Sequence, residues 1–205
     1  MMSYLDEVFS LKRKTAVVTG GGRGIGQVIA LGLAKAGAEI AVISRTGADE
    51  TVSRIQEAGG SAYSLIADVT SEKAVNAALA EILSRSRSLD IVFNNAGICV
   101  HKDTLEAGID EWREVLDINL TGEYIVARAA GRIMIERKIK GSIINMASMS
   151  GSIVNVPQRQ ASYNASKAGV IHMTRSLAVE WARYGIRVNS LSPGYIATPM
   201  SVDTP

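Results

Sequence analysis

Short apolar runs alternate along the chain with longer segments of helical periodicity. Residues 15–19 form a continuous apolar and β-branched run that stops at three glycines, which is typical of a strand buried on both faces. Apolar residues then recur at helical spacing from 25 to 36, and Gly37 follows where a helix C-cap is expected. The opening of the chain therefore predicts a strand, a glycine-rich turn and a helix.

The same alternation continues to residue 191. Further strands are predicted at 39–43, 62–67, 89–93, 142–146 and 186–191, and further helices at 48–58, 71–85, 110–138 and 161–184. Parallel strands need crossover connections of this length, and such crossovers are right-handed. We therefore predict an α/β fold: a three-layer, doubly wound parallel sheet in the order 3-2-1-4-5-6. Because no linker or repeat interrupts the pattern, residues 1–205 are interpreted as one domain.

Composition narrows the possible partners. With 47% hydrophobic and 20% charged residues, the chain can build a full core, and a net charge of +2 favours neither nucleic acid nor a membrane surface. Cys99 is the single cysteine and cannot form an internal disulfide. We interpret Cys99, His101 and His172 as structural and predict no metal site. Residues 1–14 lack the apolar run of a secretory signal, so a cytoplasmic protein that acts on a small molecule is expected.

The glycine-rich turn carries the first chemical signal. It reads Thr-Gly-Gly-Gly-Arg-Gly-Ile-Gly over residues 19–26 and joins a buried strand to an amphipathic helix. A helix N-terminus there offers unpaired N–H groups and the positive end of its dipole, and glycine lets a phosphate approach the backbone. We favour binding of a dinucleotide pyrophosphate; the alternative is a turn that only permits tight packing.

The end of the second predicted strand indicates which nucleotide. A carboxylate at this position would bind an adenosine ribose 2′-hydroxyl, but the sequence has Ser44 and Arg45. The guanidinium of Arg45 suits a 2′-phosphate, and Arg23 in the glycine-rich turn offers a second cation. The sequence therefore favours NADP(H) over NAD(H). The alternative is that Arg45 is a solvated surface residue.

A candidate acid–base pair begins the helix predicted at 161–184. Tyr163 and Lys167 stand four residues apart on one helical face, and a neighbouring ammonium favours the phenolate form of a tyrosine. Ser148 follows the strand at 142–146, whose end faces the crevice where ligands bind in such sheets. The alternative is a half-buried tyrosine beside a solvated lysine.

Together these motifs resemble the short-chain dehydrogenase/reductase family over nearly the whole chain. Besides the glycine-rich turn, the matching segments are Asp68-Val69, Asn94-Asn95-Ala96-Gly97, Pro193-Gly194 with Thr198 after it, and the four residues Asn119, Ser148, Tyr163 and Lys167. The resemblance implies a Rossmann fold and NADP-dependent transfer of a hydride between a nicotinamide and a secondary alcohol or ketone.

The resemblance also implies residue roles. Tyr163 would exchange a proton with the substrate oxygen, Ser148 would hydrogen-bond that oxygen, and Lys167 would hold the nicotinamide ribose and favour the phenolate. Asn119 would extend a proton relay through its backbone and an ordered water. The residues expected to contact the cofactor are Gly20, Arg23, Gly24, Ile25, Gly26, Ser44, Arg45, Asp68, Val69, Asn95, Ala96, Gly97, Tyr163, Lys167, Pro193, Gly194, Ile196 and Thr198.

The segment 149–158 resembles the corresponding loop of polyol and ketose members of the family. Ser150 and Asn155 would hydrogen-bond substrate hydroxyls, next to Ser148 and Tyr163. The alternative is a surface loop with a few polar residues. The NADP(H) assignment suggests reduction of a ketose. A 3-oxoacyl-[acyl-carrier-protein] reductase shares the same catalytic residues and is the second enzymatic reading.

Family members usually continue beyond the Pro-Gly loop through a substrate lid and a seventh strand, which this chain is expected to lack. The expected lack of a lid adds a third hypothesis, a non-catalytic NADP(H)-binding sensor or scaffold. The presence of Ser148, Tyr163 and Lys167 favours an enzyme. The family's pairing of long helices across subunits implies a homodimer or homotetramer. The aliphatic residues expected to serve it are Ile125, Val126, Ile133, Met134, Ile135, Val170, Ile171, Met173 and Leu177.

Overall fold

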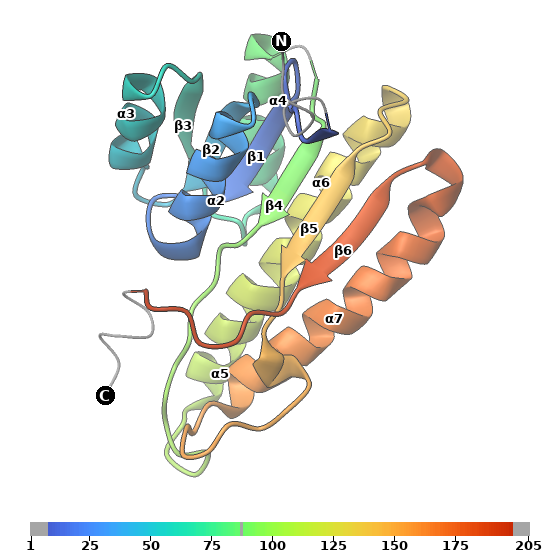
Figure 1. Ribbon diagram of the computed structural model, residues 1–205. Helices are drawn as coiled ribbons and strands as arrows, with labels where there is room; N and C mark the ends of the chain where they lie inside the picture. The colour runs from blue at the N-terminus through green and yellow to red at the C-terminus, as the bar shows by residue number, and fades with distance from the viewer. Residues whose placement is uncertain (1–7, 87, 199–205) are drawn as a thin grey trace.

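The computed structural model describes residues 8–86 and 88–198, and in that part of the chain six parallel strands form one sheet (Figure 1). The strand order is β3-β2-β1-β4-β5-β6, which confirms the predicted doubly wound arrangement. The strands are β1 (Thr15–Thr19), β2 (Glu39–Ser44), β3 (Ala62–Ile66), β4 (Ile91–Asn94), β5 (Ser142–Met146) and β6 (Arg187–Leu191). Val17 lies at the centre and is in register with Ala41 on one side and Val92 on the other.

Helices cover both faces of this sheet. They are α2 (Gly24–Lys35), α3 (Asp49–Glu57), α4 (Glu72–Arg85), α5 (Ile109–Leu116), α6 (Gly122–Glu136) and α7 (Ala161–Trp181). Alternate residues of β1 divide the core, because successive side chains of a strand point to opposite faces. Val17 packs with α4, α6 and α7, whereas Ala16 and Val18 pack with α2 and α3. The three layers thus follow from the run of apolar residues in each central strand.

The segment predicted as one helix at 110–138 is more complex. α5 passes into a π-helical turn at Asp117–Thr121 before α6 begins, and Asn119 is at the middle of that turn. A π turn accommodates one extra residue without ending the helix, so the segment was predicted as one continuous helix. The helix predicted at 161–184 closes with a 3-10 turn at Ala182–Tyr184 and a left-handed Gly185.

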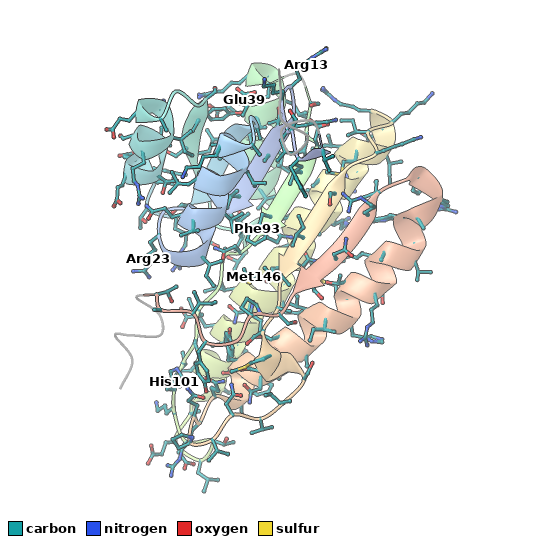
Figure 2. All side chains as sticks on the ribbon, viewed as in Figure 1. Arg13, Arg23, Glu39, Phe93, His101 and Met146 are labelled. Carbon is teal, nitrogen blue, oxygen red and sulfur yellow. The ribbon has the colours of Figure 1, made fainter. Side chains whose placement is uncertain are left out.

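The order of the strands reverses between β1 and β4, and the loops that follow these strands diverge there. Figure 2 shows Arg23 and His101 beyond the carboxyl ends of the strands, while Arg13 and Glu39 lie at the opposite end of the sheet. Open α/β sheets bind ligands at such a reversal point. None of the helices in the described segments is long and apolar enough to cross a bilayer.

Candidate active site

A cavity of about 610 Å³ lies beyond the carboxyl ends of the strands. Its walls come from the loops after all six strands and from the first turns of α7. It brings together every residue expected to contact the cofactor except Gly26, and all four residues expected to contact the substrate. Segments more than a hundred residues apart in the sequence therefore meet in one space.

Gly26 does not line the cavity, and its surroundings give the reason. A Cβ atom at this position would lie 2.5 Å from both the Asn95 side-chain nitrogen and the Gly20 carbonyl oxygen. Glycine is thus required here for close packing between α2 and the glycine-rich turn. Close packing thus explains the glycine at this position, and its expected contact with the cofactor stays a prediction.

The glycine-rich turn is held against the loop after β4. Asn95 donates its side-chain amide to the carbonyl oxygens of Thr19 and Gly20, each at 3.1 Å, and the Thr19 hydroxyl accepts the backbone N–H groups of Asn95 and Ala96. Gly20 adopts a φ of 64° and leaves no room for a Cβ beside Ala96. The turn is therefore a fixed wall of the cavity.

The N-terminus of α2 opens into the cavity without a side chain that neutralises it. Arg23 is the N-cap residue and makes no side-chain capping bond, and the first turn contains no acidic residue. The free N–H groups and the positive end of the helix dipole suit a phosphate anion. Thr198 lies across from Gly24, with its Cβ 3.7 Å from where a Gly24 Cβ would stand, so the loop after β6 closes over this end.

Arg45 lies near Asp68 at the far end of the cavity. Hydrogen bonds from the hydroxyl and the backbone N–H of Thr70 lower the pKa of Asp68, and the charge of Arg45 lowers it further. Asp68 does not cap α4, because Ser71 accepts the N–H of Ala74 in that role. Asp68 and Arg45 therefore both face the cavity as charged groups.

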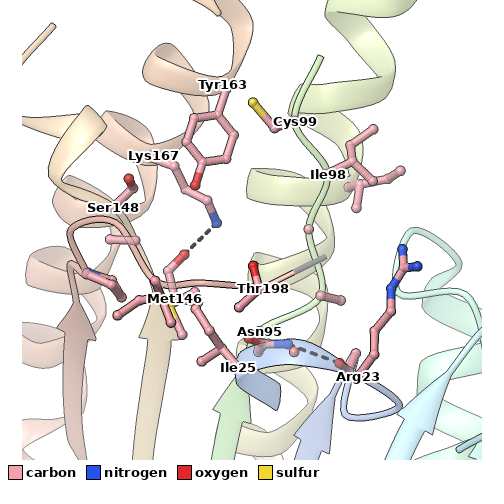
Figure 3. A pocket seen from close by; sticks show the side chains of 18 of the residues that line it. Arg23, Ile25, Asn95, Ile98, Cys99, Met146, Ser148, Tyr163, Lys167 and Thr198 are labelled. Carbon is pink, nitrogen blue, oxygen red and sulfur yellow. Dashed lines mark hydrogen bonds between the residues drawn. The ribbon is translucent and has the colours of Figure 1, made fainter. Parts of the chain in front are cut away.

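Tyr163 and Lys167 point into the cavity from the first turns of α7 (Figure 3). The ammonium nitrogen of Lys167 lies 5.9 Å from the centre of the Tyr163 ring, which confirms the shared helical face. Lys167 is buried and donates to the carbonyl oxygen of Met146, at the end of β5, at 2.5 Å. The lysine thus links α7 to the central sheet and is not a solvated side chain.

A cluster of neutral polar side chains lies beside Tyr163. Ser148 Oγ accepts the N–H of Ser150, and Ser150 Oγ accepts from Asn155 at 2.8 Å and from Gln160 at 3.2 Å. Gln160 is buried, and sequence reasoning missed it. Its position three residues before Tyr163, just outside α7, was the signal that could have found it.

Cys99 and His101 also line the cavity, although the sequence suggested purely structural roles. Cys99 Sγ is 3.5 Å from His101 Nε2 and 3.4 Å from the Gln160 side-chain oxygen. Burial raises the pKa of the Cys99 thiol to about 11, against the opposing effect of Lys167, so the thiol stays protonated at neutral pH. Within the described segments, no group of three potential ligand side chains forms a metal site.

Asn119 lies behind the cavity and is fully buried. Its side chain binds the backbone of Ile98 and donates to the Ser166 hydroxyl at 3.1 Å. Ser166 in turn donates to the carbonyl oxygen of Tyr163 at 2.7 Å. Asn119 therefore connects the loop after β4 to the turn of α7 that carries Tyr163.

The family model for short chain dehydrogenases matches residues 14–205. Galactitol 2-dehydrogenase from Rhizobium johnstonii is 45% identical over 206 residues, which cover 98% of this chain and 78% of that protein. The crystal structure of a short-chain type dehydrogenase/reductase from Mycobacterium marinum is 40% identical, with a TM-score of 0.95 over 98% of this chain and 80% of that one.

A crystal structure from Beutenbergia cavernae with NADP bound at low occupancy is 38% identical. Its TM-score is 0.87, over 95% of this chain and 77% of that one. Sequence, fold and the family model agree along almost the entire chain. The chain therefore belongs to the short-chain dehydrogenase/reductase family of oxidoreductases.

Proposed function

We propose that this protein is an NADP(H)-dependent oxidoreductase that interconverts a polyol and a ketose, with Tyr163 as the general acid and base. One observation carries the proposal. A single cavity has an uncapped helix N-terminus at one wall and Tyr163, Lys167 and Ser148 at the other. A dinucleotide and a hydroxylated substrate can therefore lie next to each other in it.

The residues present fit a nicotinamide dinucleotide phosphate. The uncapped start of α2 suits the pyrophosphate, and Arg45 with Arg23 suits a 2′-phosphate. The structure from Beutenbergia cavernae, which contains NADP, supports this choice. Bound in this way, the nicotinamide supplies or accepts the hydride. We assign the other cavity-lining cofactor contacts to the loops after β3, β4 and β6.

Residues of this chain would transfer the proton to and from the substrate oxygen. In reduction, Tyr163 would donate the phenolic proton to the carbonyl oxygen, and in oxidation the phenolate would take it from the alcohol. Ser148 would hydrogen-bond the same oxygen and stabilise the charge that develops there. Lys167 would favour the phenolate and bind the ribose hydroxyls. The backbone of Asn119 would pass the proton towards solvent through a water.

A polyhydroxylated substrate fits the polar cluster. Ser150, Asn155 and Gln160 present hydroxyl and amide groups beside Ser148. Such groups favour binding of a substrate that can form several hydrogen bonds. The similarity to galactitol 2-dehydrogenase supports the same class. We infer that reduction of a ketose is the direction favoured by NADPH. An acyl thioester offers this cluster fewer hydrogen-bonding groups than a ketose does.

A panel of substrates tests the proposal. Oxidation of NADPH is followed with fructose, sorbose, xylulose and an acetoacetyl thioester, and turnover of a ketose is expected. Tyr163→Phe should abolish turnover while NADPH binding stays near normal, and Tyr184→Phe, at an exposed tyrosine, should change neither. Turnover of the thioester alone would replace the ketose assignment with acyl reduction. Binding of NADPH without any turnover would support a sensor or scaffold.

We further propose a cytoplasmic homodimer or homotetramer that pairs through α6 and α7. The structure changes the residues that support such pairing. Of the aliphatic residues expected at the interface, Val126, Met134, Val170 and Leu177 are buried within the subunit. Tyr124 on α6 and Val179 on α7 remain exposed and are better candidates. Light scattering that shows only monomer at high micromolar concentration would contradict the assembly.

A further inference from the structure

A buried carboxyl group lies against Lys167. Glu123, in the first turn of α6, is 2% exposed, and its Oε1 is 3.2 Å from the lysine nitrogen. The Lys167 side chain is equally enclosed, so neither group of this pair is bathed in solvent. Charged groups are rarely placed together at such depth without a consequence for their ionisation. The motifs of the sequence gave no reason to select Glu123.

The geometry limits where the lysine ammonium can point. Two of its three N–H groups are used in the described structure, one by the Met146 carbonyl oxygen and one by Glu123. One donor remains to face the cavity beside Tyr163. Glu123 and Met146 thus hold the nitrogen on the side away from the cavity, at the carboxyl end of the sheet. Figure 3 shows the lysine reaching from α7 towards Met146, with the Tyr163 ring on its other side.

The second oxygen of Glu123 has no partner among the described residues, and neither has the side-chain oxygen of Asn94. Asn94 itself donates to the backbone oxygen of Glu123 at 3.0 Å and to Asn145. A buried, unsatisfied carboxylate oxygen is costly, which favours a protonated carboxyl group. Burial accordingly raises the pKa of Glu123 to about 8, although Lys167 acts in the opposite direction.

The other groups around the pair are neutral or already paired. β4 and β5 present Asn94 and Asn145, and on α4, which packs against α6, Glu72 lies at the exposed surface and pairs with Arg128 there. Facing Lys167 on the cavity side are the Tyr163 phenol and the Cys99 thiol, which stays protonated at neutral pH. Lys167 is therefore the charged group in contact with Glu123, and Glu123 is the carboxyl group in contact with Lys167.

We propose that Glu123 is a positioning residue of the acid–base site: it holds the Lys167 ammonium beside Tyr163, and its ionisation sets how much positive charge Tyr163 experiences. This inference rests on the proposed role of Tyr163. When Glu123 is protonated, the pair carries a net charge of +1 and favours the phenolate. When Glu123 loses its proton, the pair becomes neutral and that support is withdrawn.

Glu123→Gln separates charge from position. Its amide oxygen can still accept from Lys167, but the amide cannot ionise, so it never adds the negative charge that offsets the ammonium. In the wild type the positive charge of the pair is offset only as Glu123 ionises near pH 8, so the variant should differ there: its alcohol oxidation should reach a plateau earlier, with the midpoint of the pH profile moved to lower pH. Glu136→Gln, at an exposed glutamate of the same helix, should leave the midpoint unchanged.

A second measurement needs no turnover. The ultraviolet difference spectrum of phenol ionisation, taken between the wild type and Tyr163→Phe with NADP⁺ bound, reports Tyr163 directly. A midpoint of phenol ionisation that moves to lower pH in Glu123→Gln supports the proposal. Glu123→Met cannot accept a hydrogen bond from Lys167, so it should also weaken NADP(H) binding several-fold. A midpoint that stays in place or rises in Glu123→Gln would overturn the proposal. Inactivity of the wild type on every substrate would contradict the proposed function but leave this spectroscopic test intact.

Discussion

The side chain of Asn119 and the backbone of Ile98 exchange two hydrogen bonds, each 2.8 Å long. The amide nitrogen of Asn119 donates to the Ile98 carbonyl oxygen, and the amide oxygen accepts the Ile98 N–H. This pair ties the π turn between α5 and α6 to the loop after β4, which forms a wall of the cavity. A single buried side chain thus replaces the strand pairing that the loop lacks.

Asn119→Ala should therefore loosen the cavity wall. We expect a loss of about 1–3 kcal/mol in the free energy of unfolding, because the Ile98 backbone groups lose their partners. Turnover should fall by about tenfold or more, because Tyr163 is linked to Asn119 through Ser166. Thermal unfolding and steady-state kinetics measure the two effects. Asn76→Ala, at an exposed asparagine of α4, is the control and should change neither.

Arg45→Asp should shift cofactor preference towards NAD(H). The substitution removes a cation suited to a 2′-phosphate. It also adds an anion next to Asp68, and the new anion repels that phosphate. The ratio of kcat/KM for NADPH over NADH should fall by about tenfold or more. Arg132→Asp makes the same charge change on the exposed surface of α6 and should leave the ratio unaltered. An unchanged ratio in Arg45→Asp would argue against the 2′-phosphate role.

Two glycines of α2 should respond in opposite ways to alanine. Gly26→Ala places a Cβ 2.5 Å from Asn95 and from the Gly20 carbonyl, so the glycine-rich turn must shift. We expect about 1–3 kcal/mol of destabilisation and weaker NADPH binding. At Gly32 a Cβ meets no atom within 4 Å, so Gly32→Ala should stabilise the helix by about 0.5–1 kcal/mol. Denaturant unfolding and cofactor titration distinguish the two, and equal effects would refute this packing argument.

Asp90 should make stability depend on acid pH. Burial opposes its ionisation most strongly, but hydrogen bonds from Ser88, Lys14 and the Thr15 N–H outweigh burial and lower the pKa of Asp90. A lowered folded-state pKa contributes stability above the usual carboxyl range, and that stability is lost as the pH falls through the folded-state pKa. Asp90→Asn should lower the free energy of unfolding by about 1–3 kcal/mol at neutral pH and flatten its decline in acid. An equally steep decline in the variant would show that other carboxyl groups are responsible.

The local pattern of the sequence was enough to predict the strands, and the rule for right-handed crossovers in doubly wound sheets then predicted their order. Residues 15–19 and 142–146 become β1 and β5 without any change of boundary, because short apolar and β-branched runs mark strands buried on both faces, even where β5 includes the polar Ser142 and Asn145. The glycine-rich turn, Tyr163 and Lys167 could be selected for a similar reason, since short-range spacing determines where they lie relative to one another. The π turn at Asn119 escaped prediction because helix continues on both sides of it, so the segment was predicted as one helix.

What only the tertiary structure decided concerns contacts between distant segments. Gly26 and Gly24 look alike in the sequence, but Asn95 packs against the first, while the second opens to the cavity. Glu123 reads as an ordinary helical glutamate until α7 brings Lys167 to it across 44 residues. Gln160 becomes part of the polar cluster only when the loop folds Ser150 and Asn155 onto it. Hydrophobic periodicity indicates which face of a helix or strand is buried, and it can be found in a short stretch of sequence. Contacts between buried polar groups depend on how distant helices, strands and loops pack together, so a short stretch of sequence does not reveal them.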